Sequence, residues 1–307
     1  MFKYTLDNKR YYTLNYYYKT KYNSKVFKVS LNANFGCPNK KNGGGCIYCL
    51  NGSGENRGMD LIEQFIKVKD IMSKKWPDSK YIGYFQADTN TYAPLEVLKE
   101  NYEKILKLDN VVGLNIATRC DCLPNDVLDY LEELNKRTNL TIELGLQTIH
   151  ETTSKLINRG HTLKQFENAV LELRKRNINV VVHVINGLPY ETKEMMLETI
   201  KYISHLDIQV IKIHMLFVLK GTELEKLYEK EKFHILTREE YVDIVCDELE
   251  LLREDIVINR ITGDPDKNLV IEPTWLIKKF GVLNEIDKEM ERRNSYQGIN
   301  YEDILDK

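Results

Sequence analysis

Alternating apolar and polar positions in Val26–Asn34 predict a first strand, and a helical spacing of apolar residues follows in Asp60–Trp76. The same succession of a strand and a helix repeats five more times. The further strands are predicted at Lys80–Gln86, Val111–Thr118, Leu140–Gln147, Asn179–Asn186 and Val210–Val218. The further helices are predicted at Pro94–Leu106, Asn125–Lys136, Leu163–Arg176, Lys193–His205 and Arg238–Arg253. The pattern therefore predicts six strand–helix units with no linker between them.

Regular alternation of strands and helices indicates parallel strands joined by right-handed crossovers. Such a sheet either closes as a barrel or stays open and doubly wound. An open sheet would lead us to expect a nucleotide-binding glycine loop after the first strand, whereas the glycines here accompany cysteines. We therefore expect an α/β fold, a partial (βα)6 TIM-like barrel over residues 26–253. Residues 1–25 would form an N-terminal extension, and residues 254–307 a C-terminal extension that closes the barrel and substrate region.

Three of the six cysteines, Cys37, Cys46 and Cys49, lie in the glycine-rich stretch Asn32–Glu55. A structural zinc site normally takes four protein ligands. Three cysteines on one loop suit a 4Fe–4S cluster, because they hold three irons and leave the fourth iron open to a substrate or cofactor. The other three cysteines, Cys120, Cys122 and Cys246, are a weak signal for a second metal site, and we expect them to be free thiols.

Charge is unevenly spread over the 307 residues, although the net charge is only −2. Residues 1–54 carry nine Lys or Arg and a single acid, Asp7, which makes this part about +8. This basic part is either a solvated edge or a surface that faces phosphates.

The first 28 residues hold seven of the nineteen tyrosines, interleaved with Lys19, Lys21 and Lys25. We favour an amphipathic helix across a barrel end with the rings as core. Base stacking by the rings and RNA contact by the basic face stay open. Phe2–Arg10 lacks the apolar core of a signal peptide, and no window reaches the roughly 18 apolar residues of a membrane span. Uneven cysteines without a secretory signal favour a reducing compartment, so we expect a cytoplasmic protein with no membrane partner.

Polar residues follow every predicted strand, where a barrel of this kind carries its chemistry. The candidates at or near the strand ends are Gln86, Asp88, Arg119, Gln147, Arg159, Gly187, Lys212 and His214. Within the strands, Glu143 is expected to be buried and to pair with Lys212 across the barrel. His183 and His214 lie in apolar strands, where a core histidine is commoner than a ligand. Arg260 and Trp275 form either part of a substrate platform or a tail over the barrel, and we favour the tail for Trp275.

The motif Cys37-x8-Cys46-x2-Cys49 resembles the cluster motif of radical S-adenosylmethionine (SAM) enzymes, in a longer-spaced form than the commonest one. The resemblance extends along nearly the whole chain, through F-G-C-P-N, G-G-C-I-Y-C, F-Q-A-D-T-N-T-Y-A, E-L-G-L-Q-T, R-G-H-T, G-L-P-Y-E-T and K-G-T-E-L. These segments are similar to one bacterial radical-SAM subfamily, whose members include an enzyme that acts on the wobble uridine of tRNA.

The resemblance implies that the three cysteines bind a 4Fe–4S cluster whose fourth iron binds the amino and carboxylate groups of SAM. One electron then cleaves SAM and gives a 5′-deoxyadenosyl radical that abstracts hydrogen. It also implies SAM contacts by Tyr48, Gln86, Asp88, Arg119, Gln147, Arg159 and Gly187. Gln86 stands where many members have a Gly-Gly-Glu segment, which is missing here. Substrate contacts are expected from Lys212, His214, Arg260 and Trp275.

The implied substrate is wobble uridine with a 5-carboxymethylaminomethyl group, in the anticodon loop of tRNA, and the implied product is 5-aminomethyluridine. An electron donor such as flavodoxin or ferredoxin would be a further partner. Two alternatives stay open. One is a radical-SAM enzyme that acts on a small molecule or a protein, and the other is a non-enzymatic, zinc-binding RNA-interaction module.

Overall fold

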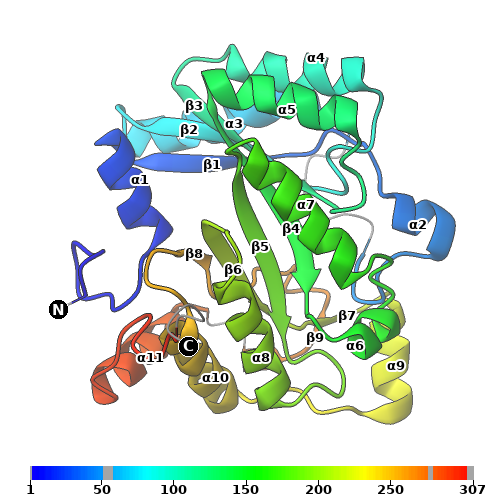
Figure 1. Cartoon of the computed structure of the whole chain (residues 1–307), viewed down its shortest axis with the longest axis vertical. Helices are drawn as coiled ribbons and strands as arrows, with labels where there is room; N and C mark the ends of the chain where they lie inside the picture. Colours follow the sequence, from blue (N-terminus) through cyan, green and yellow to red (C-terminus); the bar gives the residue numbers. More distant parts are fainter. Residues whose placement is uncertain (1, 51–57, 276–278, 303–307) are drawn as a thin grey trace.

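Seven parallel strands form one curved sheet, in the order in which they occur along the chain, in a computed structural model that describes residues 2–50, 58–275 and 279–302. The strands are β1 (Val26–Leu31), β2 (Lys80–Phe85), β3 (Val111–Thr118), β4 (Asn139–Gln147), β5 (Asn179–Asn186), β6 (Val210–Met215) and β8 (Val257–Arg260). The sheet curls into a partial barrel (Figure 1), which confirms the expected fold class.

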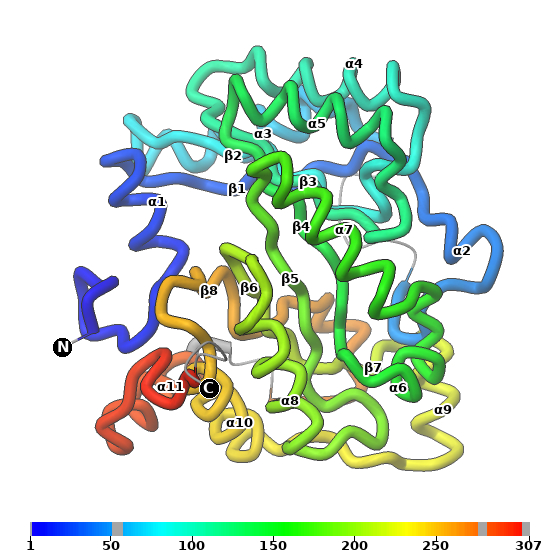
Figure 2. The backbone as a smooth tube through the Cα atoms, in the orientation of Figure 1, coloured from blue at the N-terminus to red at the C-terminus, as the bar shows by residue number. Residues whose placement is uncertain are grey.

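Helices cover the convex face of this sheet (Figure 2). These are α3 (Leu61–Lys75), α4 (Leu95–Leu106), α5 (Asn125–Arg137), α7 (Leu163–Lys175), α8 (Lys193–Ser204) and α10 (Arg238–Leu251). The remaining helices are α1 (Leu14–Tyr22), α2 (Pro38–Gly43), α6 (Glu151–Leu156), α9 (Glu223–Glu231) and α11 (Lys279–Arg292). The short strands β7 (Val218–Leu219) and β9 (Val270–Glu272) pair antiparallel in a second sheet.

Two features differ from the predicted pattern of strands. The predicted strand Val210–Val218 is divided, because β6 ends at Met215 and the chain then joins the small second sheet at Val218. A seventh strand, β8, follows α10 and pairs with β6 in parallel, so the C-terminal segment adds to the barrel as well as covering it. The predicted start of the last helix at Leu276 lies outside the described residues, as do residues 51–55 of the cysteine stretch.

The two faces of the strands carry different side chains. In β4 the residues Leu140, Ile142, Leu144 and Leu146 are fully buried under the helices, whereas Glu143 between them belongs to the opposite, concave face. The apolar positions therefore fix which face packs on the helices, and the polar positions of the same strands line the inside of the barrel.

Helix α1 closes the end of the barrel at which the strands begin. It contacts both edge strands, β1 and β8, and Thr13 caps it by accepting from the Tyr16 N–H at 3.1 Å. A small apolar cluster joins Tyr12, Leu14 and Tyr17 to the first residues of strands β5, β6 and β8. A cavity of about 140 Å³ lies beside this cluster. These tyrosine rings are thus packed, as we favoured, while Lys19, Lys21 and Lys25 are exposed.

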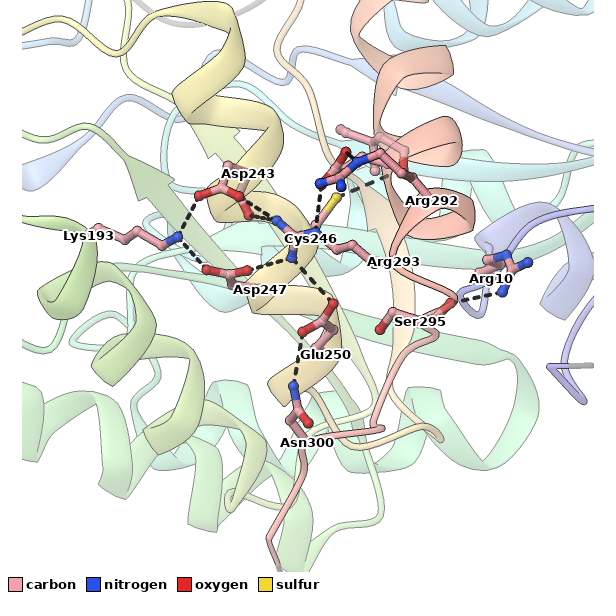
Figure 3. A network of polar contacts seen from close by, with 12 residues as sticks. Arg10, Lys193, Asp243, Cys246, Asp247, Glu250, Arg292, Arg293, Ser295 and Asn300 are labelled. Atoms are coloured by element: carbon pink, nitrogen blue, oxygen red, sulfur yellow. Dashed lines mark hydrogen bonds and ion pairs between the residues drawn. The ribbon is translucent and has the colours of Figure 1, made fainter.

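The C-terminal helix α11 is held to α10 by a network of charged groups (Figure 3). The Arg293 guanidinium, just after α11, donates to Asp247 at 2.6 Å and to Glu289 at 2.8 Å, and it also pairs with Asp243. Lys193 on α8 pairs with Asp243 and Asp247 from the other side. One arginine therefore links the C-terminal helix to the helices that cover the barrel. No helix among residues 2–50, 58–275 and 279–302 is long and apolar enough to cross a membrane.

Candidate active site

The cysteine loop begins six residues after β1, at the end of the barrel where the strands finish. Cys37 is the N-cap of α2, and Pro38 is its first residue, where a missing N–H costs nothing. The Cys49 N–H donates to the Cys46 carbonyl oxygen at 2.9 Å, which turns the two cysteines into one short loop. The Asn39 side-chain amide lies 3.7 Å from Cys46 Sγ and donates to it.

The loop is anchored to the segment after α6, at Asn158. The Asn158 amide donates to the carbonyl oxygens of Gly43 and Gly45, both at 2.7 Å. Gly45 has φ +84°, and a Cβ there would lie 2.8 Å from Cγ of Lys40, so a larger residue would be strained. Asn158 was not among the residues predicted for the site. Its backbone is left-handed, with φ 52°, a conformation that asparagine adopts more readily than most other residues.

Burial raises the pKa of the Cys46 and Cys49 thiols. A hydrogen bond with Tyr48 opposes this at Cys46, and the Lys40 ammonium opposes it at Cys49. The charges of the three cysteines also interact, because Cys37 and Cys49 both raise the pKa of Cys46. A cation that bound all three sulfurs would relieve this repulsion.

The donors on this loop are three soft sulfurs without a carboxylate, which suits an iron–sulfur cluster better than a hard cation. In the described part of the chain, no three His, Cys, Asp or Glu side chains lie close enough together to hold a single metal ion. The chemistry of the three sulfur donors fits a cluster, while the positions of the three cysteine side chains define no coordination geometry.

Several predicted SAM contacts gather beside the cysteine loop. Arg119 donates to the carbonyl oxygens of Arg159 at 2.8 Å and Gly160 at 2.9 Å, and it pairs with Asp121. Arg159 is buried and donates to the Leu146 and Thr148 carbonyl oxygens at 2.7 Å. Both arginines thus stabilise the segment that follows β4 by donating hydrogen bonds to its backbone carbonyl oxygens.

The other predicted SAM contacts lie at neighbouring strand ends. Gln86 accepts from the Ser30 hydroxyl at 2.8 Å, and Asp88, with φ 62°, lies 3.7 Å from the Lys40 ammonium. Gln147, with φ 63°, has a buried Oε1 that makes no hydrogen bond within the described residues. Gly187 has φ +78°, and a Cβ there would lie 3.1 Å from the Leu236 side chain.

Trp275, a predicted substrate contact, covers the barrel. Its indole N–H donates to the Leu236 carbonyl oxygen at 3.0 Å, and its ring lies 5.6 Å from that of Tyr241. Cys120 and Cys122 line a cavity of about 890 Å³ beside α5 and α7, and Pro38 of the cysteine loop lines it as well. Burial raises the pKa of each of these two thiols to about 12, and both are free, as is Cys246.

The concave face of the sheet carries an ionic layer, which we define as Lys28, Tyr84, Glu143, His183 and Lys212. Glu143 is central and accepts four hydrogen bonds. Asn115 donates at 2.8 Å and Lys28 at 3.0 Å to one oxygen, while His183 at 2.9 Å and Lys212 donate to the other. The Lys212 ammonium also donates to the Tyr84 hydroxyl at 2.8 Å. The expected pairing of Glu143 and Lys212 is confirmed, and Lys28 and Tyr84 are additions that the sequence did not reveal.

The pKa shifts in this layer have opposite origins. Burial opposes ionisation of Glu143, yet Lys212 and Lys28 hold its pKa well below its usual range. Burial, together with the charge of Lys28, lowers the pKa of Lys212 to about 7 even though Glu143 opposes the shift. His183 and His214, whose rings lie 5.5 Å apart, both have lowered pKa values because they are buried. The Glu143 carboxylate is therefore ionised and the two histidines are neutral, while Lys212 changes its charge near neutral pH.

Comparison with known proteins identifies the family. The model of the Radical SAM superfamily matches residues 31–203, and the model of the Radical SAM C-terminal domain matches residues 208–292. The chain belongs to the radical SAM superfamily. Members of this superfamily use a 4Fe–4S cluster and SAM, which are therefore the cofactors of this radical SAM enzyme.

Three similar proteins cover different shares of this radical SAM chain. YtqA of Bacillus subtilis is 52% identical over 97% of this chain and 94% of its own length. A tRNA uridine(34) acetyltransferase of Methanocaldococcus infernus is 24% identical over 65% of this chain and 38% of its own length. The solved structure of Methanocaldococcus infernus Elp3 with an N-terminal deletion has a TM-score of 0.71 at 18% identity. The match to Elp3 covers 89% of this chain and 64% of that structure, and it shows the shared fold alone.

Proposed function

We propose that this radical SAM enzyme modifies the wobble uridine of tRNA, converting its 5-carboxymethylaminomethyl group into 5-aminomethyl. SAM would take up the two electrons removed from the N–CH2 unit, and water would release the two carboxymethyl carbons as an oxo acid. This is the reaction implied by the resemblance of the sequence to the tRNA-modifying enzyme MnmL. The observation that carries the proposal is the similarity of the barrel to a protein named for its action on tRNA uridine 34. Because the matched region is only 38% of that relative, acetyl transfer is not part of the proposal.

In this proposal Cys37, Cys46 and Cys49 hold three irons of the cluster, and the fourth iron is left for SAM. Bound there, the cluster and SAM would supply the chemistry of hydrogen abstraction from a C–H bond. The chain positions these cofactors. Asn158 and Gly45 fix the backbone of the loop, and Lys40 favours the thiolate of Cys49.

Residues beside the loop would bind SAM. The proposed contacts are Tyr48, Gln86, Asp88, Arg119, Gln147, Arg159 and Gly187. Gln147 and Arg159 have the best support, because each has a buried polar atom without a hydrogen-bond partner in the described residues. Those atoms are Oε1 of Gln147 and one terminal nitrogen of Arg159, which lies 3.7 Å from the Glu151 carboxylate. Such atoms are costly unless a ligand or water satisfies them.

The exposed lysines of the N-terminal segment, Lys19, Lys21 and Lys25, support contact with RNA phosphates. They lie at the opposite end of the barrel from the cysteine loop, as the positions of α1 and α2 in Figure 2 show. The strands that separate them are on the order of 20 Å long. An RNA that contacts both ends must therefore extend along the barrel, and its target base must be flipped out of the anticodon loop to reach the interior.

A radical SAM enzyme that acts on a small molecule or protein is the main alternative, and an electron donor such as flavodoxin or ferredoxin is needed in either case. The zinc-binding RNA module is disfavoured by the family assignment. Nucleoside mass spectrometry of tRNA from a strain that lacks the gene separates the two enzymatic hypotheses. We expect 5-carboxymethylaminomethyluridine to accumulate, and restoration of the gene should reverse this. Unchanged wobble uridines would refute the tRNA proposal.

A further inference from the structure

The ionic layer of the barrel contains more hydrogen-bond donors than acceptors. Glu143 already accepts bonds from four groups, so it has no free lone pair for another cation. Each lysine ammonium has three donors. Lys212 uses two of them, on Glu143 and Tyr84, and Lys28 uses one, on Glu143. Three of the six ammonium N–H groups are therefore not used in these bonds, although both lysine side chains are largely buried.

The charges in the layer are also unequal. When both lysines are protonated, Lys28 and Lys212 share the single carboxylate of Glu143, which leaves one excess positive charge. Arg260 on β8 adds a further cation near the layer and lowers the pKa of Lys212, while its guanidinium lies 3.5 Å from Asp264. A buried excess charge costs free energy unless a partner of opposite charge balances it. An anionic ligand is the partner that would balance this one.

Parts of the layer are accessible to a ligand, both at the edge strands β1 and β8 and at the inner strand β5. The side chain of Lys28 on β1 is 14% exposed, that of Arg260 on β8 34%, and that of His183 22%. Lys212 and Glu143 behind them are almost completely buried. The cations therefore run from a partly exposed edge to a buried interior, and a small anion that enters from this edge meets Lys28 and Arg260 before Lys212.

The aromatic ring of Tyr84 contacts both lysines of the layer. Lys28 and Lys212 each lie 4.4 Å from the centre of the Tyr84 ring. The ring contributes a cation–π attraction to each ammonium group. Because Tyr84, Glu143 and Asn115 fix the two lysines before a ligand arrives, little ordering is needed on binding.

We propose that Lys28 and Lys212 bind the carboxylate of the carboxymethylaminomethyl group of the substrate and thereby distinguish it from uridines without a carboxylate. This inference rests on the proposed function, because it takes the substrate from there. The carboxylate lies next to the methylene group whose hydrogen is the expected target. Holding the carboxylate in the ionic layer fixes that methylene group relative to the cofactors. Lys28 and Lys212 act here as binding and positioning residues.

The test compares RNA affinities of the full-length, cluster-reconstituted enzyme. Three anticodon stem-loops differ only at the wobble uridine, which carries the carboxymethylaminomethyl group, its neutral carboxamide analogue, or no group. Fluorescence anisotropy should show that the wild type binds the carboxylate form at least tenfold more tightly than the carboxamide form, which corresponds to about 1.4 kcal/mol. Lys28→Met should remove this preference, and Lys28→Arg should restore most of it. Lys99→Met, which removes an exposed lysine of α4, is the matched control.

Equal affinities of the wild type for the carboxylate and carboxamide forms would overturn the inference. So would an unchanged preference in Lys28→Met. Lys212→Met leaves Glu143 with one cation fewer and endangers folding, so it is measured together with Glu143→Gln in a double variant. If the lysine variants lose affinity for SAM and keep their affinity for the RNA, the lysines bind the carboxylate of SAM. Failure of the wild type to convert the bound RNA, with the binding preference intact, would count against the proposed function and leave the binding site standing.

Discussion

Glu248 is a buried carboxyl group with an incomplete set of hydrogen bonds. It lies on α10 and accepts from the Asn186 amide at 2.9 Å, while its other oxygen has no hydrogen-bond partner in the described residues. Burial, with a contribution from the nearby Asp247, raises its pKa from 4.5 to about 8. Glu248 is therefore protonated in the folded protein at neutral pH, when the unfolded chain carries it ionised.

This difference makes the free energy of unfolding depend on pH. Below about pH 4.5 both states hold the proton, and between pH 4.5 and about 8 only the folded state does, so stability falls as the pH rises through this window. Above about pH 8 the loss is complete, at no more than about 5 kcal/mol. Glu248→Gln should lack this loss, so its stability relative to the wild type should increase from pH 5 to pH 8.5.

Urea unfolding at several pH values measures this gain. Glu239→Gln, which replaces an exposed carboxylate on the same helix, is the control and should show no such trend. A difference between Glu248→Gln and the wild type that stays constant with pH would contradict the assignment of a raised pKa to Glu248.

Single residues of the site were predictable where their chemistry is rare. Three cysteines on a glycine-rich loop, and Glu143 with Lys212 inside apolar strands, stand out in the sequence. Lys28 was not recognised, because a lysine in an alternating strand at the edge of a sheet usually faces solvent. Its contact with Glu143 joins residues 115 positions apart and follows from the curl of the sheet, which no local pattern reveals.

At the scale of elements, Arg293 is the main polar link between α11 and α10. Its side chain is 17% exposed and contacts Asp243, Asp247, Glu250 and Glu289 (Figure 3). Removal of the guanidinium leaves these carboxylates close together without their shared cation. Arg293→Met should therefore lower the free energy of unfolding by about 2 kcal/mol, a moderate value because the network is partly solvated.

Thermal or urea unfolding of Arg293→Met tests this account of helix docking. Arg292→Met is the matched control, because Arg292 is adjacent but 73% exposed and pairs only with Glu289 among its described contacts. The control should unfold like the wild type. Equal stability of the Arg293 variant would show that the other contacts of α11, such as the Arg238–Glu285 ion pair, hold it in place without Arg293.

Long buried elements were predicted closely, and short ones were not. The strand Val111–Thr118 and the strand Asn179–Asn186 have the predicted bounds, since their apolar runs are set by burial between two layers. The four residues of β8 carry too weak a period to be recognised after α10. The helices α2, α6 and α9 were missed because six to nine residues show little periodicity.

For the whole molecule, the predicted six strand–helix units gain a seventh strand, and both ends of the barrel have a distinct role. Helix α1 closes the end where the strands begin, and the cysteine loop lies where they finish. The ionic layer lies between these two ends on the concave face. This order places the cysteine loop, the ionic layer and the closed end along one barrel, and it agrees with the positions that the proposals give to the cofactors and the substrate carboxylate.

The most direct test of this account is to measure SAM cleavage and tRNA conversion together. Enzyme with a reconstituted cluster, a reductant and SAM is incubated with tRNA from the deletion strain, and 5′-deoxyadenosine and wobble nucleosides are quantified. We expect 5-carboxymethylaminomethyluridine to decrease as 5-aminomethyluridine and 5′-deoxyadenosine increase in equal amounts. Cys46→Ala should bind little iron and form neither product. Formation of 5′-deoxyadenosine by the wild type without any change in the tRNA, or both products from Cys46→Ala, would contradict the account.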